Sequence, residues 1–254
     1  MVTESSSVGM NPGTESGFRR TSEESTLTDG SRSIDLSKYP GRLIAIEGTD
    51  GVGRSTHIAL LREWLETRGF GVAYTAQTKS RLAGEGLRRA KEGHTLGRIT
   101  MDLFYATDFA DRLENQILPA LRAGFVVLSD RYIYSTMARS MVRGGDPEWV
   151  QDLYRFAPKP HAVFYLKIDV PRLTPRVLAR GGFDYWESGM DFQEENDLYH
   201  SWVRYQTRLI SVFDDLSRQH GFDVIDGNRE VTPVFTDLAH KVFGVVSGMD
   251  GAQR

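Results

Sequence analysis

The sequence predicts an α/β fold built on a five-stranded parallel sheet with helices on both faces. From Tyr39 onward, short apolar runs alternate with segments of helical apolar spacing, which is the pattern of such folds. A glycine-rich turn directly follows the first apolar run, and the triplet Asp130-Arg131-Tyr132 ends a later one. Both features therefore lie at the carboxyl ends of strands, where open α/β sheets bind their ligands.

The strands are predicted where apolar runs of four to eight residues are bounded by turn residues. They are expected at Leu43–Glu47, Gly71–Thr75, Phe125–Ser129, His161–Ile168 and Phe222–Ile225.

The helices are predicted between these runs, where apolar residues recur at helical spacing. A helix over His57–Leu65 follows the glycine-rich turn. A long segment over Ile99–Arg122 is helical with an interruption near Leu118-Pro119, because proline has no backbone N–H. Further helices are expected at Pro171–Arg180 and over the whole of Asp191–His220.

Composition limits the class of protein. The 254 residues are 40% hydrophobic, carry a formal net charge of −3 and include no cysteine. Disulfides and cysteine-based zinc sites are excluded, and no general electrostatic footprint for nucleic acid or a membrane surface is present. No apolar run approaches the roughly 20 residues that span a bilayer. We therefore expect a cytoplasmic protein with neither nucleic acid nor membrane as a partner.

The chain is expected to comprise one domain at 39–247 between two tails. Residues 1–38 are rich in Ser, Thr, Glu and Gly and have few large apolar side chains, so we predict a disordered N-terminal tail. Residues 248–254 are predicted to be a short C-terminal tail.

The glycine-rich turn matches the phosphate-binding P-loop pattern G-x-x-x-x-G-K-[ST], except that Arg54 stands where lysine is expected. Glycines allow positive φ and let backbone N–H groups approach an anion, and the helix that follows directs its N-terminus at it. Ser55 is expected to place its hydroxyl on Mg²⁺, and Arg54 to put its charge on the outer phosphates. The predicted nucleotide-phosphate site consists of Gly48, Thr49, Asp50, Gly51, Val52, Gly53, Arg54, Ser55 and Thr56.

The triplet Asp130-Arg131-Tyr132 ends a buried strand at the same edge of the sheet. A guanidinium at this position can hold a phosphate with two hydrogen bonds, and a neighbouring carboxylate can orient it or reach Mg²⁺ through water. Such a pair is often only a structural ion pair, but the P-loop beside it favours a second phosphate site.

From about Arg42 to about Phe243 the chain resembles the thymidylate kinase family of P-loop nucleoside monophosphate kinases. The matching segments follow in order along the chain. They are Ile46-Glu47-Gly48 with Asp50 in the loop, Leu103 to Asp108, Ser129 to Tyr132, Pro160 to Pro171, Gly182 to Phe192, and Val224 to Asp226.

The resemblance implies a P-loop NTPase-type fold with a lid at about 181–191, ATP as phosphoryl donor with Mg²⁺, a pyrimidine nucleoside monophosphate as acceptor, and a homodimer. Gly181, Gly182 and Gly189 are candidate lid hinges.

The resemblance also assigns roles by position. Asp50, Arg54 and Arg131 are the candidate catalytic residues, and Ser55 and Asp130 the candidate metal-binding residues. The acceptor would be bound by Phe104, Tyr105, Asp130, Arg131 and Thr136, with the two aromatic rings available to stack on the base.

Four positions depart from the family pattern. Arg54 replaces the P-loop lysine, and the turn after the second strand, Thr75 to Lys79, lacks an arginine for which Lys79 or Arg81 would compensate. Phe109 replaces a base-reading arginine and is expected to make the base pocket more apolar. The lid has no arginine, so Arg54 itself, or Arg176 and Arg180 one helical turn apart, are the candidates for its charge; a solvated helix face is the equal alternative for these two.

Three functions are considered, of which the two phosphate-site motifs support the first and the departures favour the other two. The first is conversion of dTMP and ATP to dTDP and ADP. The second is a kinase on the same scaffold with another pyrimidine nucleotide or a deoxynucleoside as acceptor, which Ala76 and Phe109 favour. The third is a catalytically weak nucleotide-binding or regulatory paralogue, which the missing lysine and lid arginine favour.

Overall fold

The computed structural model describes residues 34–93, 96–194 and 197–249. Five parallel strands form one sheet in the order β2-β3-β1-β4-β5. Their bounds are β1 Arg42–Glu47, β2 Val72–Ala76, β3 Val126–Asp130, β4 Ala162–Lys167 and β5 Asp223–Asp226. Each lies within a residue or so of the predicted strand, and the predicted parallel sheet is confirmed.

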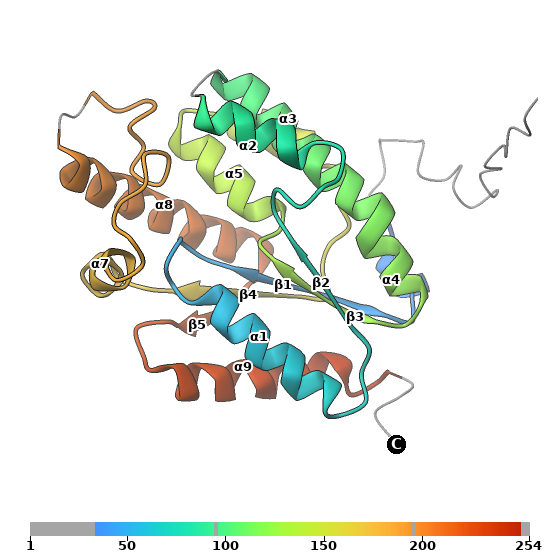
Figure 1. Cartoon of the computed structure of the whole chain (residues 1–254). Coiled ribbons are helices and arrows are strands. Elements are labelled where there is room, and N and C mark those ends of the chain that lie inside the picture. Colours follow the sequence, from blue (N-terminus) through green and yellow to red (C-terminus); the bar gives the residue numbers. More distant parts are fainter. Residues whose placement is uncertain (1–33, 94–95, 195–196, 250–254) are drawn as a thin grey trace, which may run out of the picture.

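Helices cover both faces of the sheet (Figure 1). Their bounds are α1 Arg54–Glu66, α2 Gly84–Glu92, α3 Arg98–Arg112, α4 Leu118–Arg122, α5 Ile133–Val142, α6 Pro147–Leu153, α7 Val170–Leu178, α8 Leu198–His220 and α9 Val231–Val246. Of these, α1 and α9 lie together below the sheet in Figure 1, and α3, α5 and α8 lie above it.

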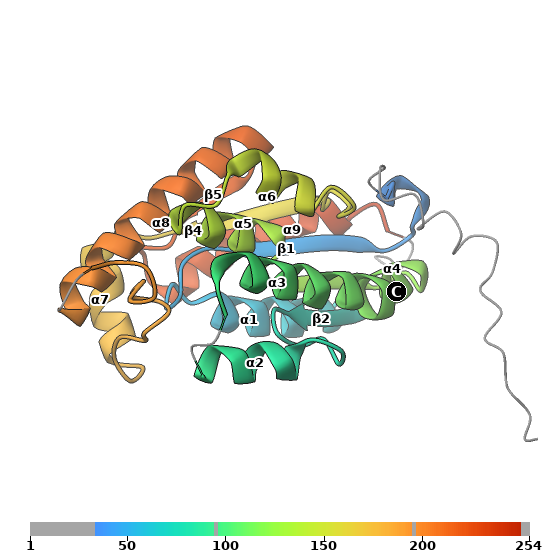
Figure 2. The same cartoon turned by 90° about the horizontal axis from the view of Figure 1, so that it is seen from above.

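The alternation of side chains along β1 explains the two layers. Leu43 and Ala45 pack into the core beneath α3, α5 and α8, whereas Ile44 and Ile46 pack into the second core, which includes residues of α1 and α9. All four are fully buried, because helices cover both faces of a parallel strand. Figure 2 shows the same layers from above.

The register brings the ends of three strands to one edge. Asp130 at the end of β3 is opposite both Ile46 of β1 and Ala76 of β2. The loops that leave β1, β2 and β3 therefore begin side by side, and the candidate site is built from these loops and the helices that follow them.

Two predicted helical segments differ from the structure. The interruption near Leu118-Pro119 takes the form of a π-helical turn at Leu113–Ile117, and the chain stays helical because Pro119 lies in the first turn of α4, where an N–H is not needed. The predicted helix from Asp191 is wrong at its start. Helix α8 begins only at Leu198, where the Asp197 side chain accepts a hydrogen bond from the His200 N–H.

Both tail boundaries need correction by a few residues. Leu36–Lys38 forms a short 3-10 helix, and Leu36 is buried in the core, so the ordered domain begins before residue 39. At the other end, Met249 is buried against α9 and its neighbours. The rest of the predicted tails, residues 1–33 and 250–254, lies outside the described residues. Among the helices that the structure describes, none is long and apolar enough to cross a membrane.

Candidate active site

The loop between β1 and α1 has the backbone that the glycine-rich pattern predicts. Gly48, Gly51 and Gly53 all have positive φ, at 141°, 87° and 105°. At Gly48 a Cβ would also lie 2.7 Å from the Leu166 carbonyl oxygen, so only glycine fits there. Ser55 and Thr56 are exposed at the start of α1, and the N-terminus of this helix is therefore open to an anion.

Arg54 does not lie where the sequence predicted it. Its side chain folds back into the loop, where Nη1 donates hydrogen bonds to the carbonyl oxygens of Gly48 and Thr49. Its Nε donates to Asp130 Oδ1 at 2.8 Å, and the residue is only 8% exposed. A planar fork can bind carbonyls and a carboxylate at once, so Arg54 ties the loop to the end of β3 rather than extending to the outer phosphates.

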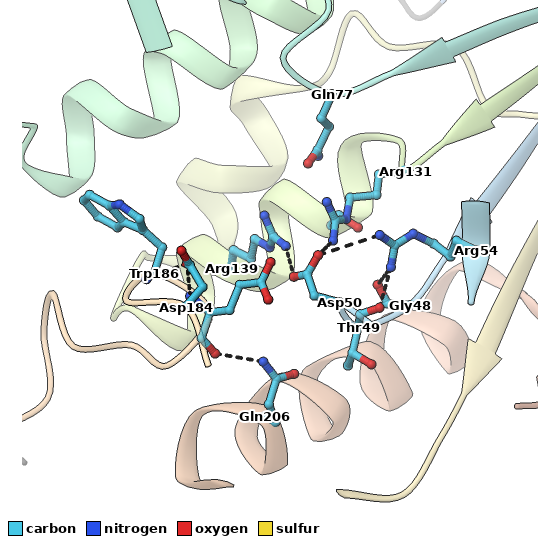
Figure 3. A network of polar contacts seen from close by, with 12 residues as sticks. Gly48, Thr49, Asp50, Arg54, Gln77, Arg131, Arg139, Asp184, Trp186 and Gln206 are labelled. Carbon is cyan, nitrogen blue, oxygen red and sulfur yellow. Dashed lines mark hydrogen bonds and ion pairs between the residues drawn. The ribbon is translucent and has the colours of Figure 1, made fainter. Parts of the chain in front are cut away.

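The Asp50 carboxylate is the centre of a cluster of arginines (Figure 3). Arg131 donates to Asp50 Oδ1 and Arg139 of α5 donates to Oδ2. The Arg54 Nη2 lies 3.8 Å from Oδ1. Because Asp50 and Asp130 together carry two negative charges against three positive ones, the cluster keeps an excess of positive charge beside the P-loop.

Arg139 is a site residue that sequence reasoning missed. It lies one turn after Thr136 on α5, and Arg143 follows one turn later. That spacing places all three on one face of the helix, and the three residues line the same cavity. The signal was present in the sequence, but nothing local to α5 indicated that this face meets the P-loop.

Glu47 fixes the position of Arg131 and the start of α5. Its fully buried carboxylate accepts hydrogen bonds from the Tyr132 N–H at 2.9 Å and from the Ser135 hydroxyl and N–H. Burial raises the pKa of Glu47, and these hydrogen bonds oppose that effect. Arg131 itself has a φ of 66°, which is uncommon for a residue with a side chain. Burial and the charge of Arg139 lower the pKa of Arg131 to about 9, and the carboxylates of Glu187 and Glu47 oppose that effect only in part.

Arg176 and Arg180 lie beside the loop between β1 and α1. A cavity of about 400 Å³ is lined by both arginines together with residues 51–53 and 55–57. Arg176 Nη1 donates a hydrogen bond to the Val52 carbonyl oxygen at 3.2 Å. Arg176 on α7 and the exposed Arg180, two residues past the end of this helix, therefore both line the cavity beside the loop.

A larger cavity of about 550 Å³ lies on the other side of the loop. Tyr105, Asp130, Arg131 and Thr136 line it, so four of the five predicted acceptor-binding residues are brought together. Ser55 lines both cavities, which therefore meet at the P-loop.

Two aromatic residues were placed wrongly. Phe104 does not line the larger cavity, because its ring turns toward α2 and lies near Gly86. Phe109 is 2% exposed and packs edge-on against Tyr132 in the core, with ring centroids 4.9 Å apart. The expected apolar base pocket is therefore wrong as well, because Phe109 does not reach the cavity.

The turn after β2 is held by Asp108 of α3. This carboxylate accepts hydrogen bonds from the N–H groups of Thr78 and Ser80 at 3.1 and 3.0 Å, and from Arg112 Nε at 2.9 Å. The turn thereby presents Lys79 to the larger cavity. Lys79 is thus placed to compensate for the absent arginine, whereas Arg81 does not line that cavity.

The lid residues close one side of the cavity. Arg143 donates hydrogen bonds to Asp191, to the Tyr205 hydroxyl and to the Trp186 carbonyl oxygen, at 2.8 Å in each case. The Trp186 indole N–H donates to the Lys91 carbonyl oxygen of α2 at 3.1 Å, and the Gln206 amide donates to the Glu187 carbonyl oxygen. Gly181, Gly182 and Gly189 have positive φ. The segment is therefore anchored to α2, α5 and α8.

The chain is similar to proteins of one family. The family model described as thymidylate kinase matches residues 46–222. A protein of Saccharolobus solfataricus named probable thymidylate kinase 2 is 38% identical over 206 residues, which are 80% of this chain and 96% of that protein. A probable thymidylate kinase of Staphylothermus marinus is 34% identical over 214 residues, 82% of this chain and all of that protein. The thymidylate kinase of Akkermansia muciniphila is 39% identical over 152 residues, 58% and 72% of the two chains. This chain belongs to the thymidylate kinase family.

Proposed function

We propose that this protein transfers the terminal phosphoryl group of ATP to dTMP, giving dTDP and ADP. The observation that carries the proposal is the meeting of two cavities at the P-loop, with Ser55 in the wall of both. A phosphoryl transfer needs donor and acceptor phosphates in line and little covalent chemistry from the protein. Two adjoining cavities with cations at their junction meet that need.

The donor would lie in the smaller cavity. The backbone of residues 48–53 and the N-terminus of α1 would hold its β-phosphate and γ-phosphate, and Arg176 and Arg180 would neutralise them. Arg54 would act as a positioning residue, since its guanidinium holds the loop carbonyls and Asp130. The outer-phosphate charge that lysine provides in other P-loops would then come from the other arginines.

The acceptor would lie in the larger cavity. Its phosphate would bind Arg131 and Arg139, which the Asp50 carboxylate holds side by side. The ring of Tyr105 would contact the base, and Lys79 would add charge from the turn after β2. The same arginines would stabilise the charge that develops on the transferred group.

The residues at the junction fit a Mg²⁺ ion bound with ATP. Ser55 and Asp130 line the same cavity, and the hydrogen bond from Arg54 goes to Asp130 Oδ1 alone. Mg²⁺ at such sites takes one or two protein oxygens besides phosphates and water, so no larger cluster of acidic residues is needed. None is present among the described residues. The ion would supply charge neutralisation on the phosphates.

The two alternative functions keep only part of their support from the sequence. Phe109 and Ala76 favoured a different acceptor; Phe109 packs in the core, and only Ala76 lines the larger cavity. A weak paralogue was favoured by the missing lysine and lid arginine. Other arginines carry positive charge to the site, because Arg131 and Arg139 line the larger cavity and Arg176 and Arg180 line the smaller one.

An acceptor panel tests the proposal. ADP formation is measured with ATP and Mg²⁺ against dTMP, dUMP, dCMP, thymidine and no acceptor, for the unaltered protein and for R54K. We expect dTMP to give the highest kcat/KM. Higher turnover with another acceptor, or activity in R54K alone, would contradict the proposed function.

A further inference from the structure

A carboxylate that the proposed mechanism does not use is buried in the wall of the larger cavity. Asp102 of α3 is 8% exposed and lines the cavity together with Thr136 and Ser140 of α5. It lies one helical turn before Tyr105, whose ring would contact the acceptor base. A buried carboxylate is costly unless it is hydrogen-bonded, so its position calls for partners.

The hydrogen bond and the ion pair that Asp102 makes both involve one carboxylate oxygen, Oδ2. The Ser140 hydroxyl donates to Asp102 Oδ2 at 2.7 Å, and Arg98 Nη1 lies 3.7 Å from the same atom. Of the described residues, none donates a hydrogen bond to Oδ1. An ionised carboxylate can accept about four hydrogen bonds, so Asp102 retains acceptor capacity in the wall of a cavity built for a ligand.

The phosphate of an acceptor is drawn to a different part of the cavity. Arg131 and Arg139 are ion-paired with Asp50 of the P-loop, whereas the ion-pair partner of Asp102 is Arg98. The Ser140 hydroxyl donates to Asp102 and the Thr136 hydroxyl donates to the Ile133 carbonyl oxygen, so both hydroxyls and Asp102 face the cavity as hydrogen-bond acceptors. Acceptors of this kind match an N–H on the edge of a nucleobase rather than a phosphate.

We propose that Asp102 determines base specificity by accepting a hydrogen bond from the N3–H of thymine. In thymine and uracil this nitrogen carries a proton, whereas in cytosine it carries a lone pair that a carboxylate oxygen would repel. A site built to bond a substrate N–H rejects an analogue without it, because the buried acceptor is then left unpaired. The inference rests on the proposed function, since it assigns the base of the same acceptor.

The test uses the 5′-monophosphate of N3-methylthymidine, in which a methyl group replaces the N3–H. The ratio of kcat/KM for dTMP to kcat/KM for this analogue is measured for the unaltered protein, for D102A and for D102N. D152A is the matched control, because Asp152 is exposed on α6 and lines neither cavity. Each ratio is taken within one preparation, so a loss of folded protein cancels.

We expect D102A to lower this ratio by at least about 10-fold, the value of one charged hydrogen bond, with the KM for ATP unchanged. The ratio for D102N is expected to lie between those of D102A and the unaltered protein, and the ratio for D152A is expected to equal that of the unaltered protein. Turnover of dTMP with the same ratio in D102A as in the unaltered protein would overturn the inference alone. No dTMP-dependent turnover by the unaltered protein would overturn the proposed function and the inference together.

Discussion

Arg54 Nε donates a 2.8 Å hydrogen bond to Asp130 Oδ1, and this pair joins the phosphate-binding loop to the end of β3. Sequence position assigns Arg54 to the phosphates of the donor. Its contacts indicate a structural role instead, because the same guanidinium also donates hydrogen bonds to two carbonyl oxygens of the loop.

Removal of this side chain tests its structural role. In R54A, the Asp130 carboxylate loses its cation and two carbonyl oxygens lose a donor, so the free energy of unfolding should fall by about 3–5 kcal/mol. The free energy of unfolding should fall less in R54K, since lysine keeps the positive charge but not the planar guanidinium with its several donors. Urea unfolding measures both. R62A, which breaks an exposed pair on α1, is the control and should change stability by less than about 1 kcal/mol. Equal losses in R54A and R62A would refute the role.

Arg139 should act mainly on the chemical step. R139A removes one of the two guanidinium groups that donate hydrogen bonds to the Asp50 carboxylate, and the loss of one such donor typically lowers kcat by about 10²–10³-fold. Steady-state kinetics should show this fall with little change in the KM for ATP. R155A is the surface control. A normal kcat in R139A would show that Arg139 only holds Asp50 in place.

Arg176 should act on the donor alone. R176A removes a cation from the cavity beside the P-loop, so the KM for ATP should rise roughly 10-fold while the KM for dTMP stays constant. R172A provides the control, since Arg172 is exposed on the same helix and lines neither cavity. Equal increases in both KM values would contradict a separate donor site.

His161 should make stability depend on pH. Its Nδ1 accepts the Leu43 N–H at 3.0 Å, and burial together with the charge of Arg42 lowers the pKa of His161. The unfolded chain therefore binds more protons below pH 6.5, and the free energy of unfolding should fall as the pH drops through that value. H161N keeps an acceptor without a titrating group and should reduce this fall in urea titrations between pH 5 and pH 7.5. The exposed H240N is the control; the same pH slope in both variants would contradict the assignment.

What the sequence could predict depended on local interactions. The strands and the P-loop were found because alternation of apolar runs and glycine spacing are properties of short segments. Phe109 and Phe104 were misplaced because family position, without packing, does not say which face of α3 meets the cavity. The start of α8 was missed because the polar residues at 193–197 give no apolar spacing that fixes a boundary, and the helix begins only after its cap at Asp197.

The misplaced Arg54 and the missed Arg139 share one cause. Their partners lie 76 and 89 residues away in the sequence, at Asp130 and Asp50. No pattern within a segment encodes such a pairing, which arises only when the sheet brings β1 and β3 together and α5 follows.

Transfer of label from [γ-³²P]ATP to dTMP in the presence of Mg²⁺, measured for the unaltered protein and for R131A, shows whether this protein phosphorylates dTMP. We expect labelled dTDP from the unaltered protein and a rate of dTDP formation lower by about 10²-fold or more in R131A, because Arg131 would bind the acceptor phosphate and the transferred group. Label released only as inorganic phosphate, or equal dTDP formation by both proteins, would contradict this expectation.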